Sequence, residues 1–230
     1  MSEEVIPTHL GLILDGNRRW AKASGLPSLE GHRKGYENLK TITKAAIERG
    51  VTYVSAYIFS TENWNRTADE VKYLMDLAYR MLTRDVKELN KAGIRVVWLG
   101  TKEKLSNKLL LAIEKAETET AGNLKGTLAL CFNYGGHTEI IEAAKKIVAS
   151  NIAENDITDD VFAKNLYQPE VPPIDLLVRT SGEQRLSGFM LYRAAYAELL
   201  FVEKHWPEFS VDDLHASLAE FARRSRRFGA

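Results

Sequence analysis

One acidic residue at the end of an apolar run is the first candidate for chemistry. Residues 10–14 (LGLIL) lead directly into residues 15–20 (DGNRRW), which begin with Asp15. Ligands of α/β proteins bind outside the carboxyl ends of strands, and backbone N–H groups that enter a helix suit phosphate. A carboxylate beside arginines therefore indicates a magnesium–phosphate site, because Mg²⁺ binds few protein carboxylates together with phosphate oxygens. The alternative is a type I turn with solvated charges.

A second apolar segment ends in the same way. Residues 51–58 are typical of a strand, and they lead into small polar residues, an aromatic residue and an arginine in residues 59–66 (FSTENWNR). The carboxyl ends of parallel strands share one edge of a sheet, so Asp15 and Asn63 are expected to face one cleft. An ordinary loop with an Asn-rich turn is the alternative.

A third polar segment, residues 179–187 (RTSGEQRLS), follows the predicted strand at 174–178. Arginine binds phosphate oxygens with paired N–H donors, and hydroxyls and backbone amides complete the shell. Glu198, just before the last predicted strand, is expected at the same edge of the sheet. The alternative is a set of scattered surface arginines. An anionic ligand with more than one phosphate would explain why the three strand ends offer Arg19, Arg66, Arg179 and Arg185.

The elements that must position these residues alternate between strands and helices. Near-continuous apolar runs, typical of a parallel sheet covered on both faces, predict strands over 10–14, 51–58, 94–99, 127–132, 174–178 and 199–202. Helical spacing of apolar residues predicts helices over 33–49, 67–92, 102–121, 137–150, 158–167 and 211–224. Thr67 and Glu70 predict a capping box. The predicted fold is α/β, a single domain over 1–230 with a mainly parallel six-stranded sheet flanked by helices.

Composition argues against several functions. The chain has 31 Lys and Arg against 31 Asp and Glu, which disfavours a general nucleic-acid binder. The P-loop, GxGxxG, GxSxG and HExxH motifs are absent from the sequence. The single cysteine, Cys131, excludes an internal disulfide. With no signal peptide or long apolar span in the sequence, a cytoplasmic protein is expected.

In order along the chain, these motifs resemble those of the cis-prenyltransferases, the undecaprenyl diphosphate synthase family. The match runs from His9 to residues 226–229 and also includes residues 31–32, 133–136 and 197–198. The resemblance implies that isopentenyl diphosphate adds in successive cis condensations to an allylic diphosphate, such as farnesyl diphosphate, with Mg²⁺ as cofactor. The implied product is a polyprenyl diphosphate, of the undecaprenyl type that serves as a lipid carrier in cell-wall synthesis. A homodimer, an apolar product tunnel between sheet and helices, and a peripheral membrane contact for product release are also implied.

The resemblance further implies roles for individual residues. Asp15 matches the catalytic, magnesium-binding aspartate, Glu198 matches a second metal-associated acid, and Asn63 matches a catalytic residue that helps to remove the proton. An amide is a poor base, so Asn63 is expected to position the proton acceptor, either diphosphate or water. The remaining implied substrate-binding residues are Gly16, Asn17, Arg18, Arg19, Trp20, His32, Ser60, Thr61, Glu62, Trp64 and Arg66, with Arg179, Arg185, Leu186 and Ser187 at the isopentenyl diphosphate site.

Two positions depart from the family pattern. Ser28 stands where members commonly have a diphosphate-binding arginine, and Arg18 is a candidate for partial compensation. Ile58 stands where many long-chain members have a smaller residue, so it is expected to restrict product length if it points into the tunnel. The paired DDxxD motifs of trans-prenyltransferases are absent. A short- or medium-chain synthase, a noncatalytic partner subunit and an unrelated phosphate-ester enzyme or binding module are the alternatives.

Overall fold

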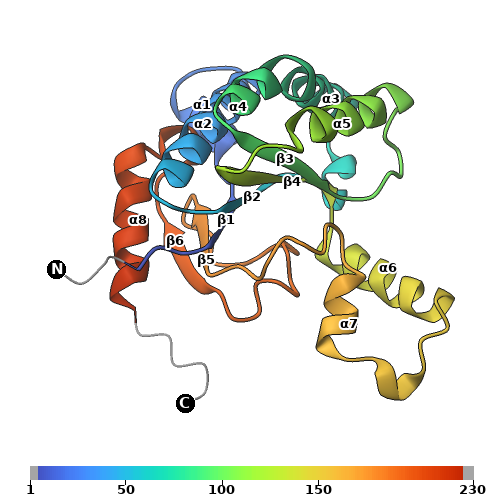
Figure 1. The fold of residues 1–230 in the computed structure, drawn as a ribbon. Coiled ribbons are helices and arrows are strands. Elements are labelled where there is room, and N and C mark those ends of the chain that lie inside the picture. The colour runs from blue at the N-terminus through green and yellow to red at the C-terminus, as the bar shows by residue number, and fades with distance from the viewer. Residues whose placement is uncertain (1–4, 225–230) are drawn as a thin grey trace.

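Within residues 5–224, which the computed structural model describes, six parallel strands form one sheet in the order β3-β4-β2-β1-β5-β6 (Figure 1). β1 lies inside the sheet, between β2 and β5. The chain therefore leaves β1 at Asp15 with polar strand ends on both sides. The six predicted strands are confirmed, with ends that shift by up to two residues: β1 (His9–Ile13), β2 (Tyr53–Ser60), β3 (Ile94–Leu99), β4 (Gly126–Tyr134), β5 (Leu176–Thr180) and β6 (Glu198–Val202).

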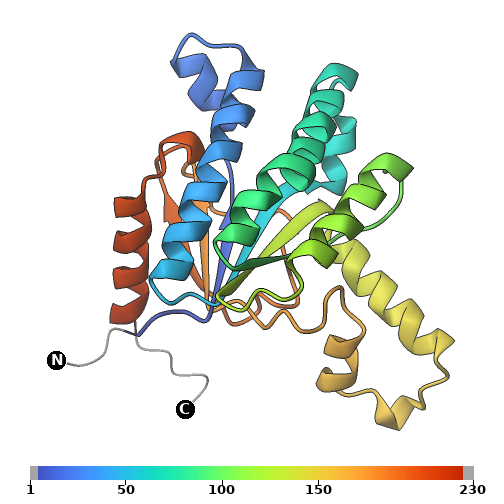
Figure 2. The same ribbon diagram turned by 45° about the horizontal axis from the view of Figure 1, so that its top comes forward.

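The helices agree with the predicted alternation, but some bounds differ: α5 begins five residues after the predicted start at 102, and α7 ends three residues before the predicted end at 167. A short helix follows β1 directly, and the next helix begins at Ser28, five residues before the predicted start at 33. Figure 2 shows that α2, the α3–α4 segment and α5 run side by side over one face of the sheet. The bounds are α1 (Asn17–Ala23), α2 (Ser28–Glu48), α3 (Ala68–Arg80), α4 (Val86–Lys91), α5 (Asn107–Thr120), α6 (Gly136–Ala149), α7 (Asp159–Lys164) and α8 (Val211–Arg223).

The helix predicted over 67–92 forms as one helical segment: α3 runs into a π-helical turn, Met81–Asp85, which runs into α4. Its N-cap is Thr67, whose hydroxyl accepts a hydrogen bond from the Glu70 backbone N–H at 3.4 Å. The return bond of a capping box is absent from this described cap, so that part of the prediction is wrong. The Glu70 carboxylate instead turns toward basic side chains at the end of the sheet.

Each face of the sheet has its own core. Leu10, Val54 and Leu128 pack under α2, α3, α5 and α8. The opposite face, which includes Cys131, packs against Phe189 and other residues of the non-helical segments 166–174 and 186–197. Cys131 is fully buried, and burial raises the pKa of its thiol well above its usual value. No helix within residues 5–224 has the length and apolar character needed to cross a membrane.

A bulge near the end of β2 changes which side chains face the helices. The pairing register with β4 shifts between Tyr57 and Phe59 and again between Phe59 and Ser60. Bulges re-aim side chains and are frequent next to active sites. The consecutive residues Ile58 and Phe59 consequently both pack on the side of the sheet that the long helices cover.

A buried histidine is expected to make the fold acid-sensitive. The ring of His9 lies between the Ser55 hydroxyl (2.7 Å) and the Pro172 carbonyl (2.8 Å), and burial lowers its pKa to about 4. The unfolded state therefore binds a proton at His9 more readily than the folded state does. The stability that comes from burying the neutral ring is fully present above pH 6.5 and is lost as the pH falls toward 4. We expect the pKa shift of His9 to lower the free energy of unfolding by about 3 kcal/mol over that range.

Urea unfolding at pH 7.0 and pH 4.5 measures this effect. The His9→Gln variant keeps hydrogen-bonding groups but cannot take the proton, so it should lose less stability on acidification than the wild type. An equal loss in both proteins would show that His9 is not the acid-sensitive group.

Candidate active site

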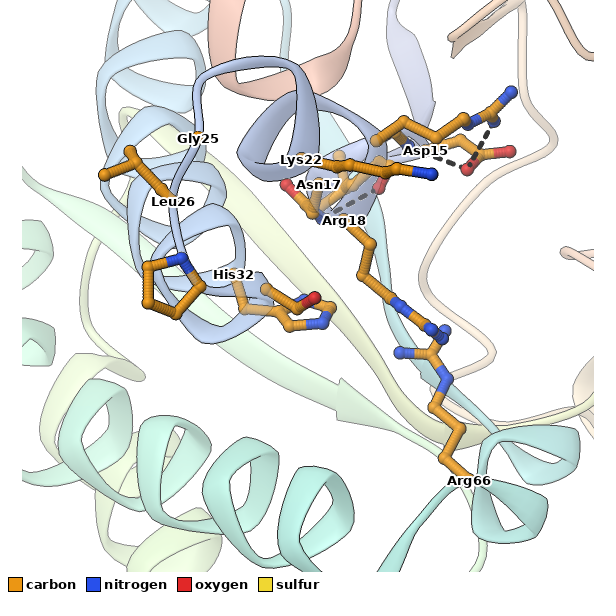
Figure 3. Close-up of a pocket in the computed structure, with 13 residues that line it drawn as sticks. Asp15, Asn17, Arg18, Lys22, Gly25, Leu26, His32 and Arg66 are labelled. Atoms are coloured by element: carbon orange, nitrogen blue, oxygen red, sulfur yellow. Dashed lines mark hydrogen bonds and ion pairs between the residues drawn. The ribbon is translucent and has the colours of Figure 1, made fainter.

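A polar pocket with a volume of about 740 Å³ lies at the carboxyl end of β1 (Figure 3). Among the described residues that line it are four cationic side chains and one carboxylate. This excess of positive charge suits a ligand that carries several negative charges. The lining residues are Leu14, Asp15, Gly16, Asn17, Arg18, Arg19, Lys22, Gly25, Leu26, Pro27, Ser28, His32 and Arg66.

The turn after β1 brings Asp15 to the pocket. Gly16 has a φ of +99°, and a Cβ there would lie 2.6 Å from the Ser181 Oγ, so glycine fits both the turn and the close packing. The Gly16 backbone N–H donates to Asp15 Oδ1 at 2.7 Å. This bond fixes the carboxylate at the start of α1.

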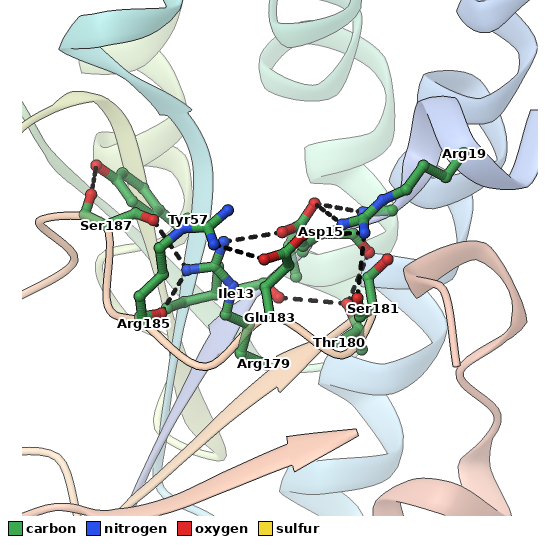
Figure 4. Close-up of polar contacts among 12 residues, drawn as sticks. Ile13, Asp15, Arg19, Tyr57, Arg179, Thr180, Ser181, Glu183, Arg185 and Ser187 are labelled. Carbon is green, nitrogen blue, oxygen red and sulfur yellow. Dashed lines mark hydrogen bonds and ion pairs between the residues drawn. The ribbon is translucent and has the colours of Figure 1, made fainter. Parts of the chain in front are cut away.

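Two arginines contact the Asp15 carboxylate from different elements (Figure 4). Arg19 Nη2 donates to Oδ1 at 3.1 Å, and Arg179 Nη2 donates to Oδ2 at 2.8 Å. Burial raises the pKa of Asp15, but the hydrogen bonds and charge of Arg179 and of Arg19 outweigh it and hold this pKa below its usual value. Asp15 is therefore ionised at neutral pH and available to a cation.

Arg179 and Arg185 occupy different environments. The Arg179 side chain is 4% exposed, and besides Asp15 it donates to Ser187 Oγ at 2.9 Å and to the Arg185 carbonyl. The Arg185 side chain is 59% exposed and pairs with Glu183, which also accepts from Arg19 at 3.1 Å. Arg179 is thus built into the framework of the site, whereas Arg185 can turn toward an incoming ligand.

Glu70, which the sequence predicts only as part of a helix cap, contacts three residues that line the polar pocket. Its carboxylate lies 2.8 Å from Arg66, 3.2 Å from His32 and 3.6 Å from Arg18. Figure 3 shows Arg18 and Arg66 reaching toward one another from opposite sides of the pocket. Glu70 offsets the repulsion between these two cations, which allows both to face the same ligand. Burial, followed by the charge of Arg66, lowers the pKa of His32 despite Glu70, so the ring is neutral at pH 7.

An apolar pocket lies next to the polar one, between the sheet and the helices α2 and α3. Leu14, Asn17 and His32 line both pockets, so the two pockets adjoin. The free volume of the apolar pocket is about 60 Å³. Its other lining residues are Gly35, Tyr36, Leu39, Tyr57, Ile58, Phe59, Leu74, Leu77, Ala78, Met81 and Phe132. Ile58 therefore points into the space expected for a product tunnel.

Glu198 does not lie beside Asp15 within this chain. It begins β6 and pairs in register with Leu176, the first residue of β5, whereas Asp15 follows the opposite end of β1. Its carboxylate instead binds Arg224 at 2.9 Å. The expectation that Glu198 joins the same edge was wrong because Glu198 precedes the apolar residues of its strand, and in a parallel sheet that end lies away from the site.

Several other candidates line neither of the two pockets. Asn63 Oδ1 accepts from the Ser60 backbone N–H at 3.1 Å in a capping box that starts the 3₁₀ helix Thr61–Asn65. The same segment also contains Glu62, which is exposed, and Trp64, whose Nε1 donates to Asn133 at 2.7 Å. Trp20 donates to Glu208 at 3.1 Å, and Leu186 packs on the second core.

Ser28 does line the pocket, at the first residue of α2. Residues 23–29, which include the short connection between α1 and α2, contain no arginine. Lys22 and Arg18 line the same pocket, and both side chains are exposed. These two residues therefore provide positive charge in the same pocket, where Ser28 provides none.

The donor set at Asp15 fits one magnesium ion bridged to a substrate. Within residues 5–224, no group of three or more acidic, histidine or cysteine side chains is arranged to hold a metal ion. Mg²⁺ is commonly bound by one or two carboxylates, with phosphate oxygens and water completing its shell. Asp15, ionised and next to a cationic pocket, matches that mode.

The fold and site together define an α/β protein with a cationic pocket at the sheet edge and an apolar pocket next to it. Residues 13–229 match the family model described as "Putative undecaprenyl diphosphate synthase". The chain therefore belongs to the undecaprenyl diphosphate synthase family of cis-prenyltransferases.

Individual relatives agree with this assignment. An isoprenyl transferase of Thermotoga maritima is 43% identical over 97% of each chain. The (2Z,6E)-farnesyl diphosphate-specific trans,polycis-polyprenyl diphosphate synthase of Thermobifida fusca is 42% identical over 100% of this chain and 83% of its own length. Among solved structures, lavandulyl diphosphate synthase from Lavandula x intermedia, in complex with dimethylallyl diphosphate, superposes with a TM-score of 0.95 at 36% identity, covering 99% of this chain and 100% of that one.

Proposed function

We propose that this chain condenses isopentenyl diphosphate with an allylic diphosphate in cis additions. The observation that carries the proposal is that a cationic pocket beside Asp15 adjoins an apolar pocket. A diphosphate fits the first pocket and its prenyl tail the second. The free volume of about 60 Å³ favours a short- or medium-chain product over an undecaprenyl-type lipid carrier. The complete Asp15–Arg179 pair argues against a noncatalytic subunit.

The residues support a reaction in which charge separates. The allylic carbon–oxygen bond breaks and the diphosphate leaves with the electron pair, while the isopentenyl double bond attacks the carbon and a proton is lost. Arg18, Arg19 and Arg66 are placed to stabilise the leaving diphosphate. When bound at Asp15, Mg²⁺ would add positive charge against the same oxygens.

Asn63 is proposed to orient the oxygen that takes the proton. Its own carbonyl oxygen already accepts a hydrogen bond from Ser60, and an amide is a poor base. The N–H donors of Asn63 therefore suit this role better than its oxygen, and the acceptor would be diphosphate or water.

Incubation of the purified chain with Mg²⁺, labelled isopentenyl diphosphate and farnesyl diphosphate tests the proposed reaction. Parallel reactions with geranyl and dimethylallyl diphosphate identify the preferred starter, and a reaction with excess EDTA tests the metal. We expect labelled products longer than the starter, and none with EDTA. If no starter yields labelled product, the proposal fails.

Arg185 is expected to act mainly on isopentenyl diphosphate. Its exposed guanidinium lies beside the buried Arg179 rather than in the allylic pocket. Arg185→Ala should raise the apparent KM for isopentenyl diphosphate by about tenfold, because one charge-assisted hydrogen bond is lost. The apparent KM for the allylic substrate should rise less. Arg185→Lys should recover only part of the loss, because lysine keeps the charge but lacks the planar guanidinium of arginine.

Steady-state kinetics with each substrate varied in turn measures this difference. Arg95→Ala serves as the control, because Arg95 also pairs with an exposed acid, Glu170, but lies on edge strand β3 away from both pockets. Equal changes in both KM values would show that the proposed division of the site is wrong.

We also propose a homodimer. The edge strand β6 carries the exposed Leu199, and Tyr196 just before it is 76% exposed. Residues 226–229, part of the basic tail in the family match, lie outside the described residues. Multi-angle light scattering should give about twice the 25.9 kDa chain mass. A monomer with full activity at micromolar concentration would contradict the proposal. Peripheral membrane contact for product release stays a prediction.

A further inference from the structure

We propose that His205 is a positioning residue of the active site and acts through a hydrogen bond to Ser181. This inference rests on the proposed prenyl transfer and adds one residue to its machinery. His205 follows β6, Ser181 follows β5 and Asp15 follows β1, and these strands are neighbours in the sheet. His205 lines neither the polar nor the apolar pocket, so its effect on the reaction must pass through the residues that it contacts.

The side chains of Ser181 and His205 pack together behind the turn that carries Asp15. Ser181 Oγ lies 2.7 Å from His205 Nδ1, and Ser181 is buried. A Cβ on Gly16 would lie 2.6 Å from the same Oγ and 2.8 Å from the same Nδ1, so both side chains lie directly against Gly16. Since the Gly16 backbone N–H donates to Asp15 Oδ1, the pair supports the turn that holds this carboxylate.

The chain neighbours of the pair bind the Asp15 backbone. The Asp15 carbonyl accepts a hydrogen bond from the backbone N–H of Trp206, the residue after His205, at 2.9 Å. The same carbonyl accepts from the hydroxyl of Thr180, the residue before Ser181, at 2.8 Å. A shift of either loop is therefore transmitted to Asp15.

Ser181 has a backbone conformation that needs support from its surroundings. Its φ is +80°, in the left-handed region that residues other than glycine rarely adopt. Such residues persist where the surrounding structure holds them, and they cluster at active sites. In this conformation the Ser181 N–H donates to the Lys204 carbonyl at 2.8 Å, and the Ser181 carbonyl accepts from Arg19 Nη1 at 3.3 Å. The bond to His205 fixes the side chain of the same residue.

These contacts connect His205 to the charged groups at Asp15 more directly than to those at Arg185. Arg19, which Ser181 binds, also donates to the Asp15 carboxylate. The Ser187 hydroxyl, by contrast, is held by Arg179 without a contact to the pair. Loss of the His205–Ser181 bond should therefore slow the chemical step and leave the binding of isopentenyl diphosphate unchanged.

A double-mutant cycle tests whether the two side chains act through one bond. Single-turnover rates and the apparent KM for each substrate are measured for His205→Ala, Ser181→Ala and the double variant of the full chain. His205→Asn is the conservative variant, because its amide offers a donor and an acceptor near the position of Nδ1. His215→Ala is the matched control, since His215 is a similarly half-buried histidine on α8 that lines neither pocket.

We expect each single alanine variant to lower the single-turnover rate by about tenfold, because small displacements of catalytic groups are costly. The double variant should be no slower than the slower single variant, His205→Asn should recover most of the rate, and His215→Ala should match the wild type. The apparent KM for isopentenyl diphosphate should stay unchanged in all of these proteins.

A wild-type rate in folded His205→Ala, or losses that multiply in the double variant, would overturn the inference. An equal loss of rate in His205→Asn and His205→Ala would overturn it too, since the hydrogen bond would then have no role. If His205→Ala does not fold by circular dichroism, a wild-type rate in Ser181→Ala overturns it. Absence of product from the wild-type chain instead contradicts the proposed function.

Discussion

Asp15→Ala should lower the rate of prenyl transfer by a hundredfold or more. Within residues 5–224, Asp15 supplies the carboxylate of the polar pocket and accepts charge-assisted bonds from Arg19 and Arg179. Its loss removes the proposed magnesium contact and leaves both guanidinium groups without their partner. Removing one strong electrostatic contact to developing charge typically costs about 3–4 kcal/mol, or roughly two to three orders of magnitude in rate.

Single-turnover assays at saturating Mg²⁺ and both substrates measure the chemical step for this variant. Circular dichroism and urea unfolding show whether the sheet remains folded, and Asp76→Ala, an exposed aspartate on α3, controls for loss of a surface charge. Asp15→Asn keeps the shape of the side chain and separates charge from geometry. Near-normal turnover of Asp15→Ala under these conditions would exclude the assigned role.

Arg179→Ala should have the second-largest effect, and its pattern should differ from that of Arg185→Ala. Arg179 holds Asp15 on one side and Ser187 on the other, so its removal disturbs both parts of the site. We expect kcat to fall by about a hundredfold. The apparent KM for isopentenyl diphosphate should rise more than that for the allylic substrate, because Arg179 contacts Ser187 and Arg185, which are proposed to bind isopentenyl diphosphate.

The Arg179→Lys variant tests whether the planar fork matters. Lysine keeps the charge but cannot bond Asp15 and Ser187 simultaneously with the same geometry, so it should restore only part of kcat. Ser187→Ala is the matched control, since it removes one contact of Arg179 and leaves Asp15 paired. If Arg179→Lys is as active as wild type, the bonds from the fork to Asp15 and Ser187 do not contribute.

Local patterns predicted the framework of the site well. The apolar runs before Asp15 and before Arg179 mark the ends of two neighbouring strands, so the approach of these two residues follows from parallel pairing. The continuity of the long helix was also predictable from its apolar face. Its π-helical turn was not, because an inserted residue changes hydrogen bonding without changing the apolar pattern.

Contacts between distant elements were less predictable. Glu70 matches the third position of a capping box, and nothing in its immediate sequence indicates the approach of His32 from α2. Glu198 was misplaced because its position before a strand was read as an edge shared with Asp15, whereas the two residues lie at opposite ends of parallel strands. Sequence patterns thus located the strand ends, but not which side chains meet across the helices.

The buried thiol of Cys131 gives the chain a built-in probe of its own opening. It is the chain's single cysteine and lies on β4, between β3 and β2 in the sheet. Because the thiolate is the reactive form, a maleimide can label the folded protein only after the sheet opens. The labelling rate in increasing urea therefore reports the free energy of that opening, and a cysteine introduced on the surface could carry a fluorophore without competition.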